Sequence, residues 1–123
     1  MRNFKKISVI LIAALFILAG LNHFRSPAMY EAMIPRYFPF HSFINYTSGV
    51  LEFTGGVMML FRYTRKLSIY LLVGLLIAFI PAHIYLIQEH GCVHSDICIP
   101  IWLAFVRLVP LQFLLMWWVW TAD

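Results

Sequence analysis

Six polar residues inside long apolar stretches are the candidates for chemistry in this sequence: Asn22, His23, Glu52, His83, Arg107 and Gln112. An ionisable group inside a membrane span costs about 2.5–3.5 kcal/mol on insertion scales, so each should have a partner or a function. Each of the four apolar stretches described below carries at least one of the six. We therefore expect them to line a polar cavity that opens outward and binds a small ligand.

Glu52 lies near the middle of its apolar stretch, among small and polar residues that recur at spacings of three and four. The set consists of Asn45, Ser48, Gly49, Glu52, Gly55 and Gly56. On a helix this spacing places the set on one face, where a neighbouring helix can approach closely and the carboxylate turns away from lipid. A protonated or purely architectural Glu52 is the alternative.

Arg107 is the predicted partner of Glu52. The two residues lie roughly 9 Å and 14 Å below the outer ends of their helices at the standard helical rise. An arginine side chain spans that difference, so we expect a buried pair between the second and fourth stretches. Pro110 follows Arg107 and removes the amide that would have bonded the carbonyl of Val106.

His23 and His83 come near the outer ends of the first and third stretches. A histidine in such a position can bind a ligand, or it can be an interfacial, hydrogen-bonded residue. Helical periodicity does not place His83 on the small-residue face that begins at Gly74 and Ala78. We therefore expect a bend at Pro81 to turn it inward.

Both cysteines of the chain lie in segment 88–100, which we expect on the oxidising side of the membrane. A disulfide between Cys92 and Cys98 is the first expectation for that compartment. A soft metal site that includes His90 and His94 is the alternative, although its spacing matches no standard zinc pattern, and free thiols are the third. The chain has no C-x-x-C pair, so it does not contain a complete dithiol relay.

The elements that position these residues follow from the composition. Hydrophobic residues make up 63% of the 123 residues and charged residues only 11%, against roughly half and a quarter in soluble domains. The length allows one domain, residues 1–123. A bilayer core needs roughly 20 apolar residues per helix, and four stretches meet this requirement: 7–24, 43–61, 67–87 and 101–120. The predicted fold is an all-α membrane protein, a four-transmembrane-helix bundle.

The basic residues predict how the bundle is oriented, because Lys and Arg in short connections stay on the cytoplasmic side. Six of the nine lie before the first stretch or between the second and third, two lie in the other loops, and Arg107 lies in the fourth stretch. Both termini should be cytoplasmic, and loops 25–42 and 88–100 should face outward. The basic excess is thus explained by topology, and no nucleic-acid partner is expected.

Two features of the N-terminal third have alternative interpretations. The first stretch has some features of a secretory signal, but its length favours a retained helix. Segment 25–42 is rich in proline and aromatic residues. We expect it to pack over the mouth of the bundle, with a plain surface loop as the alternative.

Four short segments, one in each stretch, carry a family resemblance: AGLNHF at 19–24, SGVLEFTGG at 48–56, PAHIY at 81–85 and RLVPLQ at 107–112. Together they resemble the DoxX-like family of small four-helix bacterial membrane proteins. The resemblance implies a four-helix bundle in the inner membrane and, by analogy with a member linked to thiosulfate and quinone oxidation, a redox-associated role. His83 stands where that family often has Asn, and the loop cysteines are not a family hallmark.

The predicted function is that of an inner-membrane protein whose outward polar cavity binds a small hydrophobic or redox-active molecule, such as a quinone, within a membrane redox system. Its partners would be the lipid bilayer and a membrane redox protein. No phosphate loop, dinucleotide fingerprint or serine nucleophile elbow occurs, so the sequence does not assign a reaction. A non-catalytic subunit that stabilises a membrane complex is the second reading. A small transporter, in which Glu52 exchanges a proton for a cationic solute, is the third.

Overall fold

The computed structural model describes residues 2–90, 92–94 and 97–122. Its elements are α1 (Arg2–Arg25), α2 (Pro27–Met33), α3 (His41–Leu60), α4 (Arg65–Ala78), α5 (Ile80–Gln88), β1 (Cys92–His94), β2 (Ile97–Cys98), α6 (Ile101–Val106), the π-helical turn η1 (Arg107–Leu111) and α7 (Gln112–Trp120). Apart from the short hairpin β1–β2, the described chain is helical. The all-α prediction is therefore confirmed.

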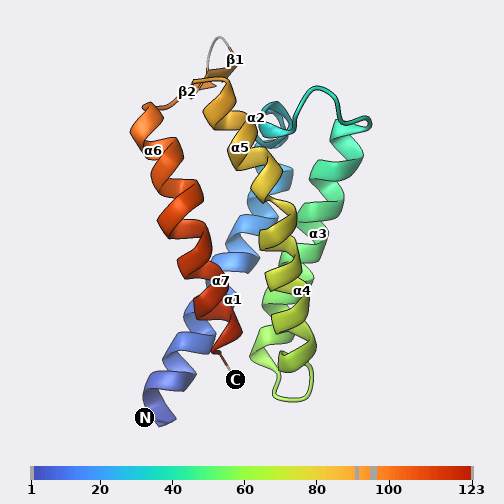
Figure 1. Ribbon diagram of the computed structural model, residues 1–123. Helices are drawn as coiled ribbons and strands as arrows, with labels where there is room; N and C mark the ends of the chain where they lie inside the picture. Colours follow the sequence, from blue (N-terminus) through green and yellow to red (C-terminus); the bar gives the residue numbers. More distant parts are fainter. Residues whose placement is uncertain (1, 91, 95–96, 123) are drawn as a thin grey trace.

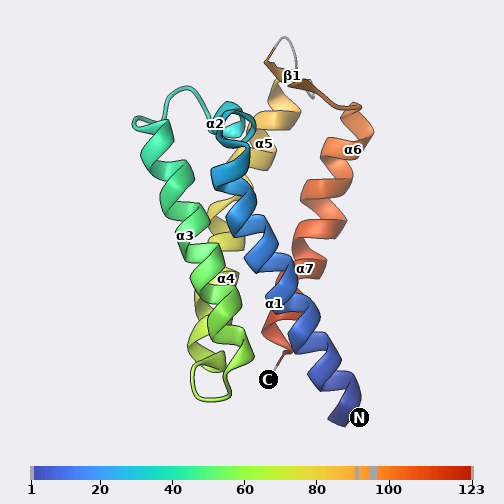
Figure 2. The same cartoon turned by 180° about the vertical axis from the view of Figure 1, so that it is seen from behind.

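The long helices form rods that run up and down beside one another (Figure 1). The rods are α1, α3, α4 with α5, and α6 with η1 and α7. Both chain ends and the link 61–64 lie at one end, here called the terminal end, whereas α2 and the hairpin lie at the other, here called the loop end. The view from behind shows α1 beside α3 over much of its length (Figure 2).

Three of these rods are long and apolar enough to span a membrane: Asn3–Arg25, Arg65–Gln88 and Ile101–Trp120. They correspond to the first, third and fourth predicted stretches. Helix α3 has 20 residues but is not among the candidates. The structure thus gives a helical protein with three candidate membrane spans.

Glycine lets α1 and α3 approach until their backbones touch. A Cβ on Gly20 would lie 2.7 Å from both the carbonyl oxygen of Gly49 and the amide nitrogen of Phe53. A Cβ on Gly56 would lie 2.9 Å from the amide nitrogen of Ile17. Small residues are the usual means of close helix packing in membranes, where lipid is as apolar as a leucine side chain. The small face predicted around Glu52 therefore contacts α1, except at Gly55, which packs against Leu72 of α4.

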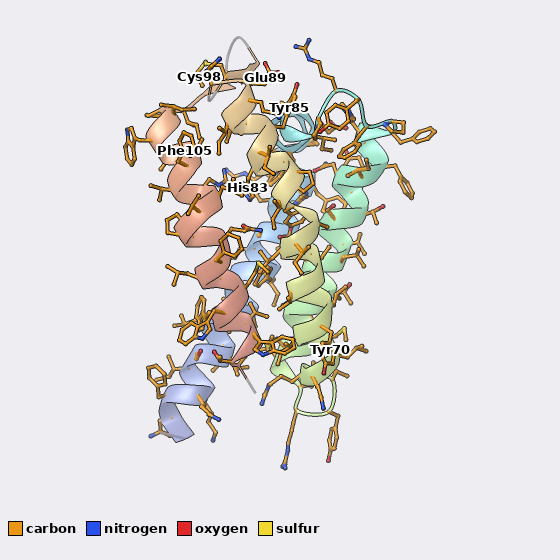
Figure 3. All side chains as sticks on the ribbon, in the orientation of Figure 1. Tyr70, His83, Tyr85, Glu89, Cys98 and Phe105 are labelled. Atoms are coloured by element: carbon orange, nitrogen blue, oxygen red, sulfur yellow. A yellow bond between two sulfur atoms is a disulfide. The ribbon has the colours of Figure 1, made fainter. Side chains whose placement is uncertain are left out.

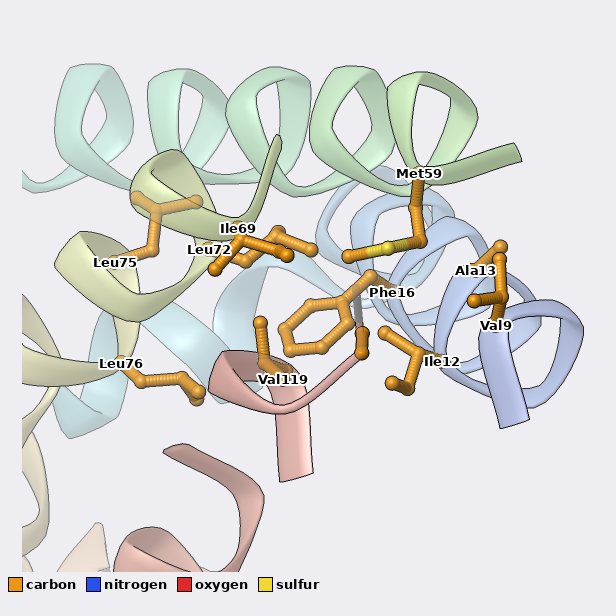
Figure 4. Packing of buried hydrophobic residues seen from close by; sticks show 11 residues of the cluster. Val9, Ile12, Ala13, Phe16, Met59, Ile69, Leu72, Leu75, Leu76 and Val119 are labelled. Atoms are coloured by element: carbon orange, nitrogen blue, oxygen red, sulfur yellow. The ribbon is translucent and has the colours of Figure 1, made fainter. Parts of the chain in front are cut away.

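The apolar core fills the terminal end of the bundle (Figure 4). It joins side chains from α1, α3, α4 and the C-terminal segment: Val9, Ile12, Ala13, Phe16, Met59, Ile69, Leu72, Leu75, Leu76, Val119 and Ala122. A smaller cluster lies near the loop end and consists of Ala32, Tyr85, Leu86 and Ala104. The predicted polar residues lie between these two clusters along the rods.

Two prolines interrupt helical rods, each in its own way. Pro81 stands at the second position of α5, and the chain changes from α4 to α5 at Phe79. Pro110 lies inside η1, where the amide of Gln112 bonds to the carbonyl of Arg107, one residue further back than in an α-helix. The α6–α7 rod therefore continues through Pro110 by widening one turn.

The hairpin between α5 and α6 carries the two cysteines. Cys92 on β1 pairs with Cys98 on β2, and their sulfur atoms form a disulfide with the Cα atoms 4.1 Å apart. The alternative metal site would need both sulfurs, which the disulfide occupies. Residues 91, 95 and 96 and the side chain of His94, which belong to the same predicted loop, lie outside the described part of the structure.

Candidate functional site

A cavity of about 380 Å³ lies between the rods, on the loop-end side of the apolar core. Five of the predicted residues line it: His23, Glu52, His83, Arg107 and Gln112. The sixth, Asn22, is not in its wall and instead donates a hydrogen bond of 2.7 Å to the hydroxyl of Tyr30, which does line the cavity. The structure thus brings side chains from α1, α3, α5 and the α6–α7 rod to one space.

His23 and Glu52 form the closest polar contact of the cavity. The Nε2 atom of His23 lies 2.6 Å from Oε2 of Glu52, and both side chains are about 7% exposed. Among the described residues, Glu52 Oε2 has no other polar partner. This contact joins α1 to α3 at the level of Gly49, where an added Cβ would lie 2.7 Å from the Cβ atom of His23.

Asn45 orients the His23 ring. Its amide nitrogen donates to the backbone carbonyl of His23 over 3.1 Å, which leaves its Oδ1 facing His23 Nδ1 at 2.8 Å. Because Oδ1 only accepts hydrogen bonds, Nδ1 of His23 carries a proton and donates it to Asn45. Asn45 belongs to the small polar face predicted on α3, although the sequence argument did not assign it to the site.

The same geometry shows where a further proton lies. With Nδ1 donating to Asn45, the other ring nitrogen of His23 faces a carboxylate oxygen at 2.6 Å. A ring-nitrogen lone pair and a carboxylate oxygen would repel at that distance, so one of the two groups carries a proton. His23 and Glu52 together carry no net charge, whichever of the two groups holds this proton.

The predicted pair between Glu52 and Arg107 is wrong. Glu52 contacts His23, and no ion pair or hydrogen bond joins Arg107 to any residue that the structure describes. Depth along the helix axis allowed the pairing, but α1 packs directly on α3 and brings His23 closer. Arg107 lines the cavity as an exposed side chain, and its guanidinium acts electrostatically on His83.

Segment 25–42 covers the loop end of the cavity, as predicted. It forms α2, whose Tyr30 ring stacks on the His23 ring with centroids 3.9 Å apart. Ile34, Pro35 and Phe38, which follow α2, also line the cavity. Tyr30 was missed as a site residue because its position on a short helix between Pro27 and Pro35 could not be placed from periodicity.

His83 is buried and faces the α6–η1 rod, a placement visible in Figure 3. Its orientation does not need the predicted bend, because His83 lies seven residues after the buried Leu76 and so continues the same helical face. Gly74 is exposed and lies on the other side of α4. Gly74 therefore does not belong to the inner face of α4, although Ala78 lines the cavity.

Gln112 connects the fourth rod to the break in the third. Its amide nitrogen donates a hydrogen bond to the backbone carbonyl of Leu76, in the last turn of α4. The Gln112 side chain also forms a hydrogen bond with the ring of His83. In contrast, Nδ1 of His83 is buried and has no partner among the described residues.

The site therefore offers proton exchange, hydrogen bonding and, among the described residues, a cation without an acidic partner. Within the described residues, no group of three or more His, Cys, Asp or Glu side chains could hold a metal ion. The rest of the wall is mostly apolar and aromatic, with Phe16, Leu75 and Phe79 among its residues, and it also includes Asn45 and Ser48. Such a mixture of apolar walls and a few polar groups is typical of small-molecule sites.

Comparison of the sequence with known protein families identifies one match. The model of the Domain of unknown function (DUF8561) matches residues 12–123. The chain belongs to the DUF8561 family. The match includes every residue that lines the cavity, from Leu15 to Leu115. No curated protein and no solved structure matches this DUF8561 chain.

Proposed function

We propose that this DUF8561 protein is an integral inner-membrane protein that binds a small hydrophobic molecule with an oxygen-bearing polar head. The observation that carries the proposal is the cavity of about 380 Å³, in which apolar walls surround Arg107 and the His23–Glu52 pair. Protein cavities of about 300–1,000 Å³ are the usual size for small-molecule sites. Polar groups inside membrane segments are costly, which favours a functional reason for their presence.

The proposal includes a fourth membrane span, α3. The polar residues that lower its mean hydropathy, Asn45 and Glu52, are buried against α1 and the cavity. Its outer face is apolar, with Phe43, Val50 and Leu60 exposed. Helix α3 has the length to cross a bilayer core of about 30 Å at the helical rise. Four crossings and the basic residues at the terminal end support cytoplasmic termini.

Quinones are the ligand class that the family resemblance favours. A quinone has an apolar body and carbonyl oxygens that accept hydrogen bonds from an arginine or from the His23–Glu52 pair. The segments that resemble the DoxX-like family contain these residues, and that resemblance supports a place in a membrane redox system. A membrane redox protein would then be the partner.

A stabilising subunit without a ligand is the second candidate. The observation in its favour is that Glu52, His23 and Asn45 satisfy one another across α1 and α3, as a purely structural network would. In that case the cavity would be filled by lipid or by a partner chain.

Thermal unfolding of the purified protein in a neutral detergent separates these candidates. A quinone with a decyl tail should raise the melting temperature in a concentration-dependent manner, because a ligand that binds only the folded state stabilises it. Ala78 lines the cavity, so the ring in Ala78→Phe should occupy the space of the ligand and abolish the shift. Ala14 is exposed on α1 outside the cavity, so Ala14→Phe should preserve the shift. Equal shifts in both variants, or none in the unaltered protein, would count against a quinone site.

A further inference from the structure

We infer that the cavity prefers an anionic amphiphile, a molecule with an apolar tail and a carboxylate or phosphate head that pairs with Arg107. This inference rests on the proposed function, because it names the class of molecule that the proposed site binds. It follows from the charge of the cavity and from the order of polar and apolar residues along its walls.

The charged groups of the cavity do not cancel. Those in its wall are His23, Glu52, His83 and Arg107. The first two share a proton and are neutral as a pair, as the Asn45 contact requires. His83 is neutral or positive, so it cannot compensate Arg107. The cavity therefore carries at least one positive charge.

Arg107 has no carboxylate partner in the described part of the chain. The described acidic residues other than Glu52 are Glu31 and Glu89, and Glu31 accepts a hydrogen bond from Ser42 on the next helix. Neither Glu31 nor Glu89 lines the cavity. A guanidinium offers a planar fork of donors that matches two oxygens of a carboxylate or phosphate. An anionic head in the cavity would supply the missing charge.

The walls change from polar to apolar in the same direction on three rods. His23 on α1, His83 on α5 and Arg107 on η1 lie toward the loop end. Eight residues away toward the terminal end, Leu15, Leu75 and Leu115 line the same cavity. Eight residues span about 12 Å on a helix. An amphiphile fits this gradient with its head near Arg107 and its tail toward the apolar core.

The cavity volume limits the tail. At about 30 Å³ for each atom with its share of space, 380 Å³ holds on the order of a dozen non-hydrogen atoms. A medium-length fatty acid or alkyl phosphate has this size. A diacyl phospholipid does not fit entirely.

The test measures thermal unfolding of the full chain in a neutral detergent with four probes: dodecanoate, methyl dodecanoate, dodecyl phosphate and the decyl quinone. The pH is kept well above the ordinary pKa of a carboxylic acid, so that dodecanoate is charged. We expect either or both anions to raise the melting temperature at concentrations about tenfold lower than the ester, and the responding anion identifies the head group. Arg107→Gln should remove the preference and Arg107→Lys should retain part of it. Arg62→Gln, exposed at the terminal end, should leave it unchanged.

The possible results separate this inference from the proposed function. Equal effects of dodecanoate and its ester, or stabilisation by the quinone alone, would overturn the anionic preference and leave the binding cavity supported. An anion effect that persists in Arg107→Gln would overturn the role of Arg107 and indicate that its guanidinium reaches the lipid head groups instead. If Arg107→Gln does not fold, the acid and ester comparison on the unaltered protein still decides. Stabilisation by no probe would overturn both proposals.

Discussion

His23 and Glu52 are the residues on which the packing of α1 against α3 and the chemistry of the cavity both depend. Their 2.6 Å contact joins two helices at a level where both side chains are largely buried. Removing one member leaves a polar group without a partner in an apolar environment, which costs more than removing both. The pair should therefore behave as one unit in stability measurements.

A double-mutant cycle measures this coupling. Glu52→Leu alone or His23→Phe alone should lower the free energy of unfolding in detergent by about 3–5 kcal/mol, less where the survivor changes protonation. His23→Phe keeps an aromatic ring against Tyr30. The double variant should recover about 1–3 kcal/mol of the summed loss. In the matched cycle, the losses caused by Glu52→Leu and Arg107→Gln should be additive. Strong coupling between these two substitutions would indicate that Glu52 pairs with Arg107 after all.

The sequence identified the polar residues of the site but not their pairing. Composition and spacing place Glu52 and Arg107 at similar depths, because helical rise fixes position along the axis. Which side chains meet also depends on which helices touch and on how each is rotated. The glycines of α1 and α3 determine how these two helices touch, because Gly20 packs directly against Gly49. The sequence alone does not show which glycines face each other.

At the scale of the elements, the α1–α3 contact determines the position of the site. A side chain on Gly20 would meet backbone atoms of Gly49 and Phe53 that cannot rotate away. Any enlargement there must move the helices apart, and His23 moves with α1, three residues further along. Packing and site geometry are therefore expected to fail together.

Gly20→Ala and Gly74→Ala form a matched pair for this expectation. Gly20→Ala should lower the free energy of unfolding by about 1–3 kcal/mol through overpacking. Gly74→Ala should be neutral or stabilising by up to about 1 kcal/mol, because a Cβ there meets nothing within 4 Å and alanine is the better helix former. Gly20→Ala should also weaken probe binding in the cavity. The expectation fails if the two variants unfold alike.

The positions of the helices could be predicted from the sequence, but the buried face of each helix was harder to predict. All four apolar stretches fold as rods, since runs of that length are a strong signal. The inner face of α4 was misjudged because small residues were taken as its contact surface. Apart from Ser68, its buried residues are large, including Leu72 and Leu76, and they continue to His83 at intervals of eleven and seven. Small residues mark the interface on α3, where the partner backbone is close, whereas on α4 Gly74 is exposed and Ser68 is buried against the carbonyl of Gly55.

The whole molecule is polarised along the rods. Lys5, Lys6 and Arg65 lie at the terminal end, where they line a second pocket, while the cavity lies toward the loop end. Large apolar side chains are exposed on every rod, including Leu18, Phe53 and Trp117. A soluble protein rarely exposes so much apolar surface, so lipid is the expected surrounding.

The direction in which α3 crosses the membrane is the test of this arrangement. The links before and after α3 lie at opposite ends of the bundle, so they should lie on opposite sides of the membrane. Single cysteines at Arg36 and Tyr63, both exposed, can report this in a chain with Cys92→Ser and Cys98→Ser. An impermeant maleimide should label Arg36→Cys in intact spheroplasts and Tyr63→Cys only after lysis, because the basic residues beside Tyr63 hold that end in the cytoplasm. Lys5→Cys serves as the control and should follow Tyr63→Cys. Labelling of positions 36 and 63 from the same side would mean that α3 does not cross, and the cavity would then lie at the membrane surface and not within it.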